Sequence, residues 1–391
     1  MIVLVTIHGI GFQSAPTALN ADDGYADPLH KNLCAQPPLG DGVLGDDPNR
    51  LQAGGDGPVY VQSCVPLDKH DPQEEQKYSY EGGLGRLGTW SGSALDPSDQ
   101  PLAPEGARLA HVALVYSNLE GVAGDLDATL ALGVLGAPTL THFATVGGIV
   151  KLAFQDIRVL AMRHGEPAPS LRVRPEAQHH RGAISTIIHH GAPATGPLAT
   201  LYEIQDDVAA YVVRNELRER VRGFIRDAVG RLLARPDVEG VIINGHSNGT
   251  VMGFDLITAM SPPSALRVLA FITAGCPLRK YVDFMDWGVD GYSLALLRPG
   301  GWTNFYDQVD PVADPLQPLA DWKRGDDLPP GGGPGMFVTF DPTSGAPSQI
   351  AVKDEIVDNV AAQVGGGLPA HNYWDNLVFC AKLAEVIAQV L

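Results

Sequence analysis

The chain has 391 residues, 45% of them hydrophobic and 18% charged, so it is long enough to bury a large core. Its formal net charge of −18 argues against non-specific binding to nucleic acid or to an anionic membrane surface, because both need positive charge. The four cysteines (Cys34, Cys64, Cys276, Cys380) form no CxxC pair, which argues against a zinc ribbon or a redox motif and favours free thiols over a Cys34–Cys64 disulfide.

The first residues predict a buried strand. Residues 2–7 are apolar and mostly β-branched, and they end at "HGIG", residues 8–11, which is typical of a glycine loop. The opening stretch has no basic region and no small-residue cleavage site, so we expect a cytoplasmic location.

Residues 13–105 are rich in glycine, proline and aspartate, and we interpret them as a long insertion. Within it, 58–67 predicts a strand. The next clear buried strand is "HVALVYS", residues 111–117. The function of the insertion is not readable from its sequence.

An apolar segment follows. Residues 128–150 contain no Asp, Glu, Lys or Arg, and a segment of this length could span a bilayer. Pro138, His142 and several glycines and threonines favour buried or lid helices instead. Residues 151–163 continue as an amphipathic helix. We therefore interpret 121–200 as an apolar helical cap or lid plus an irregular linker, compatible with contact at a membrane surface without spanning it. The two histidine pairs in this region lack the spacing of a metal site.

The second half of the chain alternates strands and helices. Helices are predicted at 205–234, 249–260 and 375–391, and strands at 238–244, 266–275 and 302–306, with weaker strands at 336–340 and 348–352. Continuous apolar strands separated by helices indicate an α/β fold, with a mostly parallel central sheet and helices on both faces. We expect residues 1–391 to form a single domain.

Residues with nucleophilic, acidic or basic side chains follow these strands. Ser247 lies in Gly245-x-Ser247-x-Gly249 after the 238–244 strand, three aspartates follow 302–306, and His371 precedes the last helix. Because ligands bind at the carboxyl ends of parallel strands, we expect these loops to meet at one edge of the sheet.

This arrangement resembles the α/β-hydrolase superfamily. The resemblance is carried by "GHSNG" between strand and helix, by "HGIG", by "VDPV" and by the late histidine, and it covers roughly 1–12, 107–118 and 205–391. "GHSNGTVMGFDLI", preceded by the long helix, and "TAGCPL" are most similar to intracellular lipase-like and phospholipase-like members.

The resemblance implies a serine esterase or lipase that needs no metal or cofactor. Ser247 would be the nucleophile, His371 the base, and Asp310, which precedes a proline in "DPV", the carboxylate; Asp307 and Asp314 remain alternatives. The oxyanion donors would be the N–H of Asn248 and an N–H of Gly9 or Ile10.

Other side chains near these loops are expected to be structural. We interpret His8 and His246 as packed histidines, and Tyr373, Trp374 and Asp375 as anchors of the last helix.

Several alternatives stay open at this point. An acyltransferase, a thioesterase or an amidase would use the same triad, and a non-catalytic protein that binds lipid or a partner would keep the fold. The apolar 121–163 segment favours a small-molecule or lipid-like ester with a hydrophobic acyl group. The natural substrate and the oligomeric state are not readable from the sequence.

Overall fold

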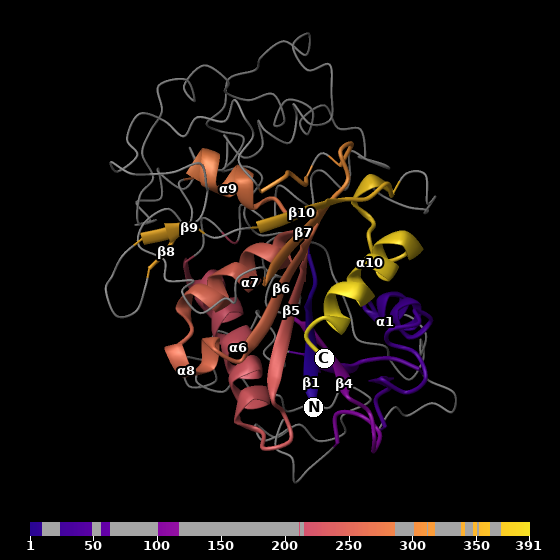
Figure 1. Ribbon diagram of the computed structural model, residues 1–391. Coiled ribbons are helices and arrows are strands. Elements are labelled where there is room, and N and C mark those ends of the chain that lie inside the picture. The colour runs from indigo at the N-terminus through magenta and orange to yellow at the C-terminus, as the bar shows by residue number, and fades with distance from the viewer. Residues whose placement is uncertain are drawn as a thin grey trace, which may run out of the picture.

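The computed structural model describes residues 1–9, 24–48, 56–62, 101–116, 211, 215–285, 301–310, 312–316, 338–340, 347–349, 352–359 and 369–391 (Figure 1). Ile10, the 121–200 segment and both histidine pairs lie outside these ranges, so the cap or lid prediction is not addressed. In the part of the chain that is described, no helix is long and apolar enough to cross a membrane.

An eight-stranded sheet forms the centre of the molecule. The strand order is β10-β7-β6-β5-β1-β4-β2, with β3 also paired to β4, and every pairing in this sheet is parallel. The strands are β1 (Ile2–Ile7), β2 (Leu44–Gly45), β3 (Val59–Gln62), β4 (Leu109–Val115), β5 (Gly240–His246), β6 (Val268–Ala274), β7 (Trp302–Tyr306) and β10 (Val352–Ile356).

Helices cover both faces of the sheet (Figure 1). Helices α6 (Asn215–Ala234) and α7 (Asn248–Ala259) pack together on one face, and α1 (Asp27–Cys34) and α10 (Leu377–Ala388) pack together on the other. The remaining elements are α8 (Pro262–Ala265), α9 (Leu278–Met285), the 3-10 turn η5 (Pro369–His371) and an antiparallel pair, β8 (Val338–Phe340) with β9 (Pro347–Gln349). The predicted α/β class, with a largely parallel sheet, is confirmed.

The burial of the strands explains why the central ones are visible in the sequence. Strands β1 and β4 are buried along their whole length, since helices cover both of their sides, and they read as continuous apolar runs. Edge strand β10 reads VKDEI and is only partly buried, so it lacks that signal. The predicted strand at 348–352 is therefore wrong in its position: residues 347–349 pair with β8, and the sheet strand begins at Val352.

Parts of residues 13–105, which the sequence predicts to be an insertion, contribute to the sheet and the core where the chain is described. Strands β2 and β3 both pair with β4 and extend the sheet, and the latter corresponds to the strand predicted at 58–67. Helix α1 packs against α10, and its Leu29 and Leu33 are fully buried in the core cluster. These described parts therefore belong to the core of the fold.

Successive strands are added to opposite sides of the sheet on either side of the β1–β5 pair. The neighbour of β1 on one side is β4, whereas the next strand after β5 lies on the other side, at β6. In open parallel sheets, ligands bind outside the carboxyl ends of the strands at such a switch point. The ends of β1 and β5 therefore mark where a site is expected, at the edge away from the chain termini in Figure 1.

Candidate active site

Ser247 lies in a strained turn between β5 and α7. Its backbone angles are φ 54 and ψ −128, a conformation that costs a non-glycine residue of order 1–3 kcal/mol. Its N–H donates to the Ala274 carbonyl at the end of β6, 2.9 Å away, which holds the turn against the sheet. The residue is only 1% exposed in this structure.

The flanking glycines are required by close packing. A Cβ on Gly245 would lie 2.7 Å from the Gly249 carbonyl oxygen, and a Cβ on Gly249 would lie 2.3 Å from the His8 carbonyl oxygen. Distances this short exclude any side chain at either position. The two glycines let α7 start directly over the ends of β5 and β1.

Gly9 brings the loop after β1 against the serine. A Cβ on Gly9 would lie 2.3 Å from Ser247 Cβ and 3.0 Å from Ser247 Oγ. The loop is fixed from its other side, because the Tyr116 hydroxyl lies 2.8 Å from the carbonyl oxygens of His8 and Gly9 and donates to them. The backbone of Gly9 is thus held beside the hydroxyl of Ser247.

His371 and Asp310 are joined by a buried hydrogen bond. His371 ends η5, just before α10, and its Nδ1 lies 2.8 Å from Asp310 Oδ2 in the loop after β7. The Asp310 side chain is fully buried, and its Oδ1 accepts from the Val312 N–H at 2.9 Å. Since a carboxylate only accepts, Nδ1 of the imidazole carries the proton and Nε2 is the basic atom.

The three aspartates predicted after β7 have different partners. Asp310 pairs with His371, whereas the Asp307 carboxylate accepts hydrogen bonds from the backbone N–H groups of Val309 and Asn359. Asp314 forms an ion pair with Lys280 of α9. Of these three carboxylates, Asp310 alone is bonded to the imidazole.

Tyr373 supports the carboxylate of Asp310. Its hydroxyl donates to Asp310 Oδ2 at 2.9 Å and accepts from the Asp307 N–H at 2.9 Å. Burial and the neighbouring Asp310 raise the pKa of Tyr373 well above its ordinary value of 10.0, so the hydroxyl stays protonated and remains a donor. The sequence predicts only that Tyr373 anchors the last helix, and the hydrogen bond to Asp310 is a further contact of this side chain.

His371 and Ser247 both lie against the end of β6. Gly275 has φ +64, and a Cβ there would lie 2.7 Å from His371 Cε1, so the imidazole occupies the space that the missing side chain leaves. Ser247 is bonded to the preceding residue, Ala274. His371 Nε2 is buried and has no hydrogen-bond partner in the described part of the chain, so it does not bond with Ser247 here.

The environment keeps Asp310 charged. Burial alone would raise the pKa of the Asp310 carboxyl, but His371, the Val312 N–H and the Tyr373 hydroxyl stabilise the carboxylate and hold the pKa below its ordinary value of 3.8. A buried carboxylate that stays ionised stabilises an imidazolium beside it.

Two further histidines, the buried His8 and the partly buried His246, are neutral. Burial lowers the pKa of His8 from 6.5 to about 3, and burial together with His371 lowers that of His246 to about 3. The ring of His8 stacks on Tyr116, and Nε2 of His246 donates to the His371 carbonyl at 2.9 Å. Both contacts agree with the predicted structural role of these histidines.

Of the predicted oxyanion donors, Asn248 and Gly9 lie beside Ser247. Asn248 is the first residue of α7, where backbone N–H groups have no partner within the helix. Its side-chain Oδ1 accepts from the Tyr281 hydroxyl at 2.6 Å, which fixes the start of the helix. Ile10, the other candidate, lies outside the described residues.

Sequence reasoning missed the roles of Gly275 and Tyr373. The signal for Gly275 was a glycine directly after a strand, in "TAGCPL", and the signal for Tyr373 was an aromatic residue two positions after the histidine. Neither signal identifies a partner without the fold. A comparison of the chain with known protein families, curated proteins and solved structures finds no match.

Proposed function

We propose that the chain has an α/β-hydrolase fold and is a serine hydrolase that cleaves carboxylic esters with hydrophobic acyl groups. The observation that carries the proposal is the buried Asp310–His371 hydrogen bond, 2.8 Å long, whose imidazole lies against the same strand end as Ser247. Acyl transfer needs a nucleophile, an oriented base and an ionised carboxylate, and these three groups lie in loops at the same edge of the sheet.

In this mechanism Ser247 attacks the ester carbonyl while Nε2 of His371 takes its proton. Asp310 holds the imidazole with Nε2 unprotonated and stabilises the imidazolium that forms. The alcohol leaves with that proton, and an acyl-enzyme remains. Water then attacks the acyl carbonyl while His371 takes its proton, and His371 gives this proton to Ser247 Oγ as the bond to the acyl group breaks, which releases the carboxylic acid.

Charge on the carbonyl oxygen is stabilised by backbone N–H groups. The N–H of Asn248 lies at the start of α7, where the helix dipole also favours negative charge. Gly9 supplies the second donor in this proposal. Loss of one such donor typically lowers kcat by about 10²–10³. The Asn248 N–H belongs to the backbone, so it cannot be removed by side-chain substitution.

The hydrophobic acyl group is supported by composition. Residues 128–150 carry no charged side chain, and segments of this kind inserted after a strand often cover the binding site of such enzymes. A chain-length series of 4-nitrophenyl esters tests this part. Faster turnover of medium-chain than of acetyl esters is expected, and a strong preference for short polar esters would contradict it.

The nucleophile is tested with a fluorophosphonate probe and with Ser247→Ala. The probe should label the wild type once, and Ser247→Ala should lose both labelling and ester turnover. Ser264→Ala is the matched control, because Ser264 is a partly exposed serine in α8. Equal labelling of wild type and Ser247→Ala would contradict the proposal.

An acyltransferase, a thioesterase or an amidase would give the same labelling. Turnover measured with competing alcohols and amines separates these reactions from hydrolysis, because each gives a different product from the acyl-enzyme. A folded wild type that neither labels nor turns over any acyl substrate would favour a non-catalytic lipid-binding or partner-binding protein.

A further inference from the structure

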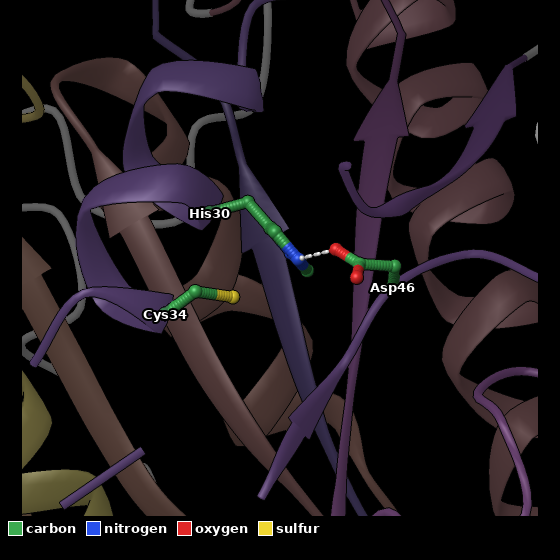
Figure 2. A group of neighbouring side chains, drawn as sticks. All are labelled: His30, Cys34 and Asp46. Carbon is green, nitrogen blue, oxygen red and sulfur yellow. Dashed lines mark hydrogen bonds and ion pairs between the residues drawn. The ribbon is translucent and has the colours of Figure 1, made fainter. Parts of the chain in front are cut away.

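A second cluster of side chains that can bind a metal ion lies on the side of the sheet that α1 and α10 cover. His30 and Cys34 are four residues apart on α1, so they project from the same face of the helix, and Asp46 directly follows β2. One ligand atom from each of the three, His30 nitrogen, Cys34 Sγ and an Asp46 oxygen, lies within 4.8 Å of the other two. Figure 2 shows both α1 side chains directed toward the chain that carries Asp46.

The imidazole of His30 is held in place from behind. Its Nε2 faces the cluster, 2.9 Å from Asp46 Oδ1, and its Nδ1 lies 3.1 Å from Nδ1 of His111. The two rings are stacked, with an interplanar angle of 4°, and both side chains are fully buried. His111 Nε2 in turn lies 2.8 Å from Thr6 Oγ1 on β1.

This is the support that metal-binding histidines usually have. A ligating imidazole generally hydrogen-bonds through its other nitrogen, which fixes both its tautomer and the direction of the ring. A histidine that merely fills space or pairs with one carboxylate does not need a second buried imidazole aligned behind it. The His30–His111–Thr6 chain therefore points to a ligand on the Nε2 side of His30.

We propose that His30 Nε2, Cys34 Sγ and the Asp46 carboxylate bind a divalent transition-metal ion, with Zn²⁺ as the ion that fits the donor set best. One nitrogen, one sulfur and one oxygen suit zinc, whereas Ca²⁺ and Mg²⁺ take oxygen ligands. The side chain of Asp46 is 43% exposed, so water has access to complete a tetrahedral site.

The ligand atoms lie near the spacing that a zinc ion needs. Zinc lies about 2.0–2.3 Å from nitrogen, oxygen and sulfur ligands, which places tetrahedral ligands roughly 3.5 Å apart. His30 Nε2 and Asp46 Oδ1 are 2.9 Å apart and must separate slightly, and Cys34 Sγ lies within 4.8 Å of both.

Binding of the ion releases one proton and fixes the positions of the protons on the two imidazoles. Cys34 ligates as a thiolate, so its thiol proton goes to solvent. The His30 proton must lie on Nδ1, where it is donated to His111, and His111 then carries its own proton on Nε2 facing Thr6. The ion replaces the hydrogen bond between His30 and Asp46 and links α1 to the segment that follows β2.

The test uses the full-length protein without a polyhistidine tag, stripped of metal by a chelator and titrated with Co²⁺ and then with Zn²⁺. We expect one ion per chain, a thiolate-to-Co²⁺ charge-transfer band in the near ultraviolet, and displacement of Co²⁺ by Zn²⁺. Cys34→Ser should abolish the band. Cys380→Ser is the matched control and should keep it, because Cys380 is a free cysteine in α10 that is not part of the cluster.

Further variants separate ligands from support. His30→Gln and Asp46→Asn should each weaken Co²⁺ binding at least tenfold, and His111→Gln should weaken it about 10–100-fold without removing the charge-transfer band. Circular dichroism of each metal-free variant shows whether it has folded.

The wild type alone is sufficient to overturn the proposal. If it fails to bind one ion per chain, or if X-ray absorption at the zinc edge shows no sulfur ligand, the site does not exist. An unchanged band in folded Cys34→Ser would overturn it equally. None of these outcomes depends on esterase activity, so the metal site and the proposed function are tested separately.

Discussion

Replacement of Tyr373 by phenylalanine tests whether the support of Asp310 contributes to catalysis. The change removes a hydroxyl that donates to Asp310 Oδ2 at 2.9 Å and that accepts from the Asp307 N–H. A hydrogen bond to a charged group contributes about 1.5–3 kcal/mol. Because each 1.4 kcal/mol of transition-state energy is about tenfold in rate, we expect kcat/KM for an ester to fall between about 10-fold and 100-fold.

The pH profile gives a second, independent readout of Tyr373→Phe. Without the hydroxyl, the Asp310 carboxylate is held less firmly against the imidazole, which is the cause of the expected loss of rate. It also loses a donor that lowers its pKa, so it becomes more basic and retains a proton on the imidazole up to higher pH. The acid limb of kcat/KM should therefore move to higher pH. A purely structural role for Tyr373 would lower the stability and leave this limb where it is.

Tyr60→Phe is the matched control for this experiment. The Tyr60 hydroxyl also donates to a buried carboxylate, Asp27 Oδ1 at 2.8 Å, and also accepts a backbone N–H, that of Ala26 at 2.9 Å. Urea unfolding should show a loss of stability in both variants, whereas only Tyr373→Phe should lose activity. If the two variants have the same kcat/KM and the same acid limb, the inferred role of Tyr373 is wrong.

Three more outcomes are expected. Asp310→Asn should lower kcat by about 10⁴ with little change in KM, because an amide no longer holds the proposed base in the required tautomer; a loss below tenfold would contradict its role. Gly275→Ala should lose more ester activity than Gly106→Ala, since both have positive φ (+64 and +94) but a Cβ meets the imidazole only at Gly275. Gly106→Ala should cost about 1–2 kcal/mol of stability through its backbone conformation, and Gly275→Ala should cost more, because its Cβ also overlaps His371 and Tyr373; urea unfolding measures both. Folding keeps His8 and His246 neutral with pKa values of about 3, while the unfolded chain takes up protons below about 6.5. Their contribution is therefore intact above pH 6.5 and is lost as the pH falls, by about 2 kcal/mol each at pH 5.0. Equal unfolding free energies at pH 7.5 and 5.0 would refute this.

The sequence predicted the elements whose residues are buried on all sides. Strands β1, β4, β5 and β6 read as largely apolar runs because helices cover both faces of the sheet, and β7 reads as the mostly β-branched and aromatic WTNFY. Strand β2 has two residues and β10 is a charged edge strand, so neither has a run to detect. Helix α1 is short and mostly polar, and its place in the core depends on α10, which lies more than three hundred residues later.

The candidate site was predictable in its residue types and only partly in its contacts. The order of Ser247, Asp310 and His371 along strand-ending loops is a sequence property. The choice of Asp310 over Asp307 and Asp314 rests on how one loop folds, and the sequence favoured Asp310 only through the following proline and the resemblance of "DPV" to the acid loop of related hydrolases. The cluster of His30, Cys34 and Asp46 has no motif spacing, because its third member comes from another element.

The three glycines around Ser247 show why the pattern carries more weight with the fold than without it. A chance Gly-x-Ser-x-Gly in a turn needs only its own local geometry, in which a Cβ on Gly245 meets the backbone of Gly249. Here Gly249 is also required by the carbonyl of His8, which follows β1, and Gly9 is required by Ser247 itself. Two loops that lie more than two hundred residues apart in the chain therefore fit each other at backbone contact, and each excludes a side chain on the other. This mutual fit holds the backbone of Gly9 and the first residue of α7 beside Ser247, as the two N–H donors of the proposed mechanism would require.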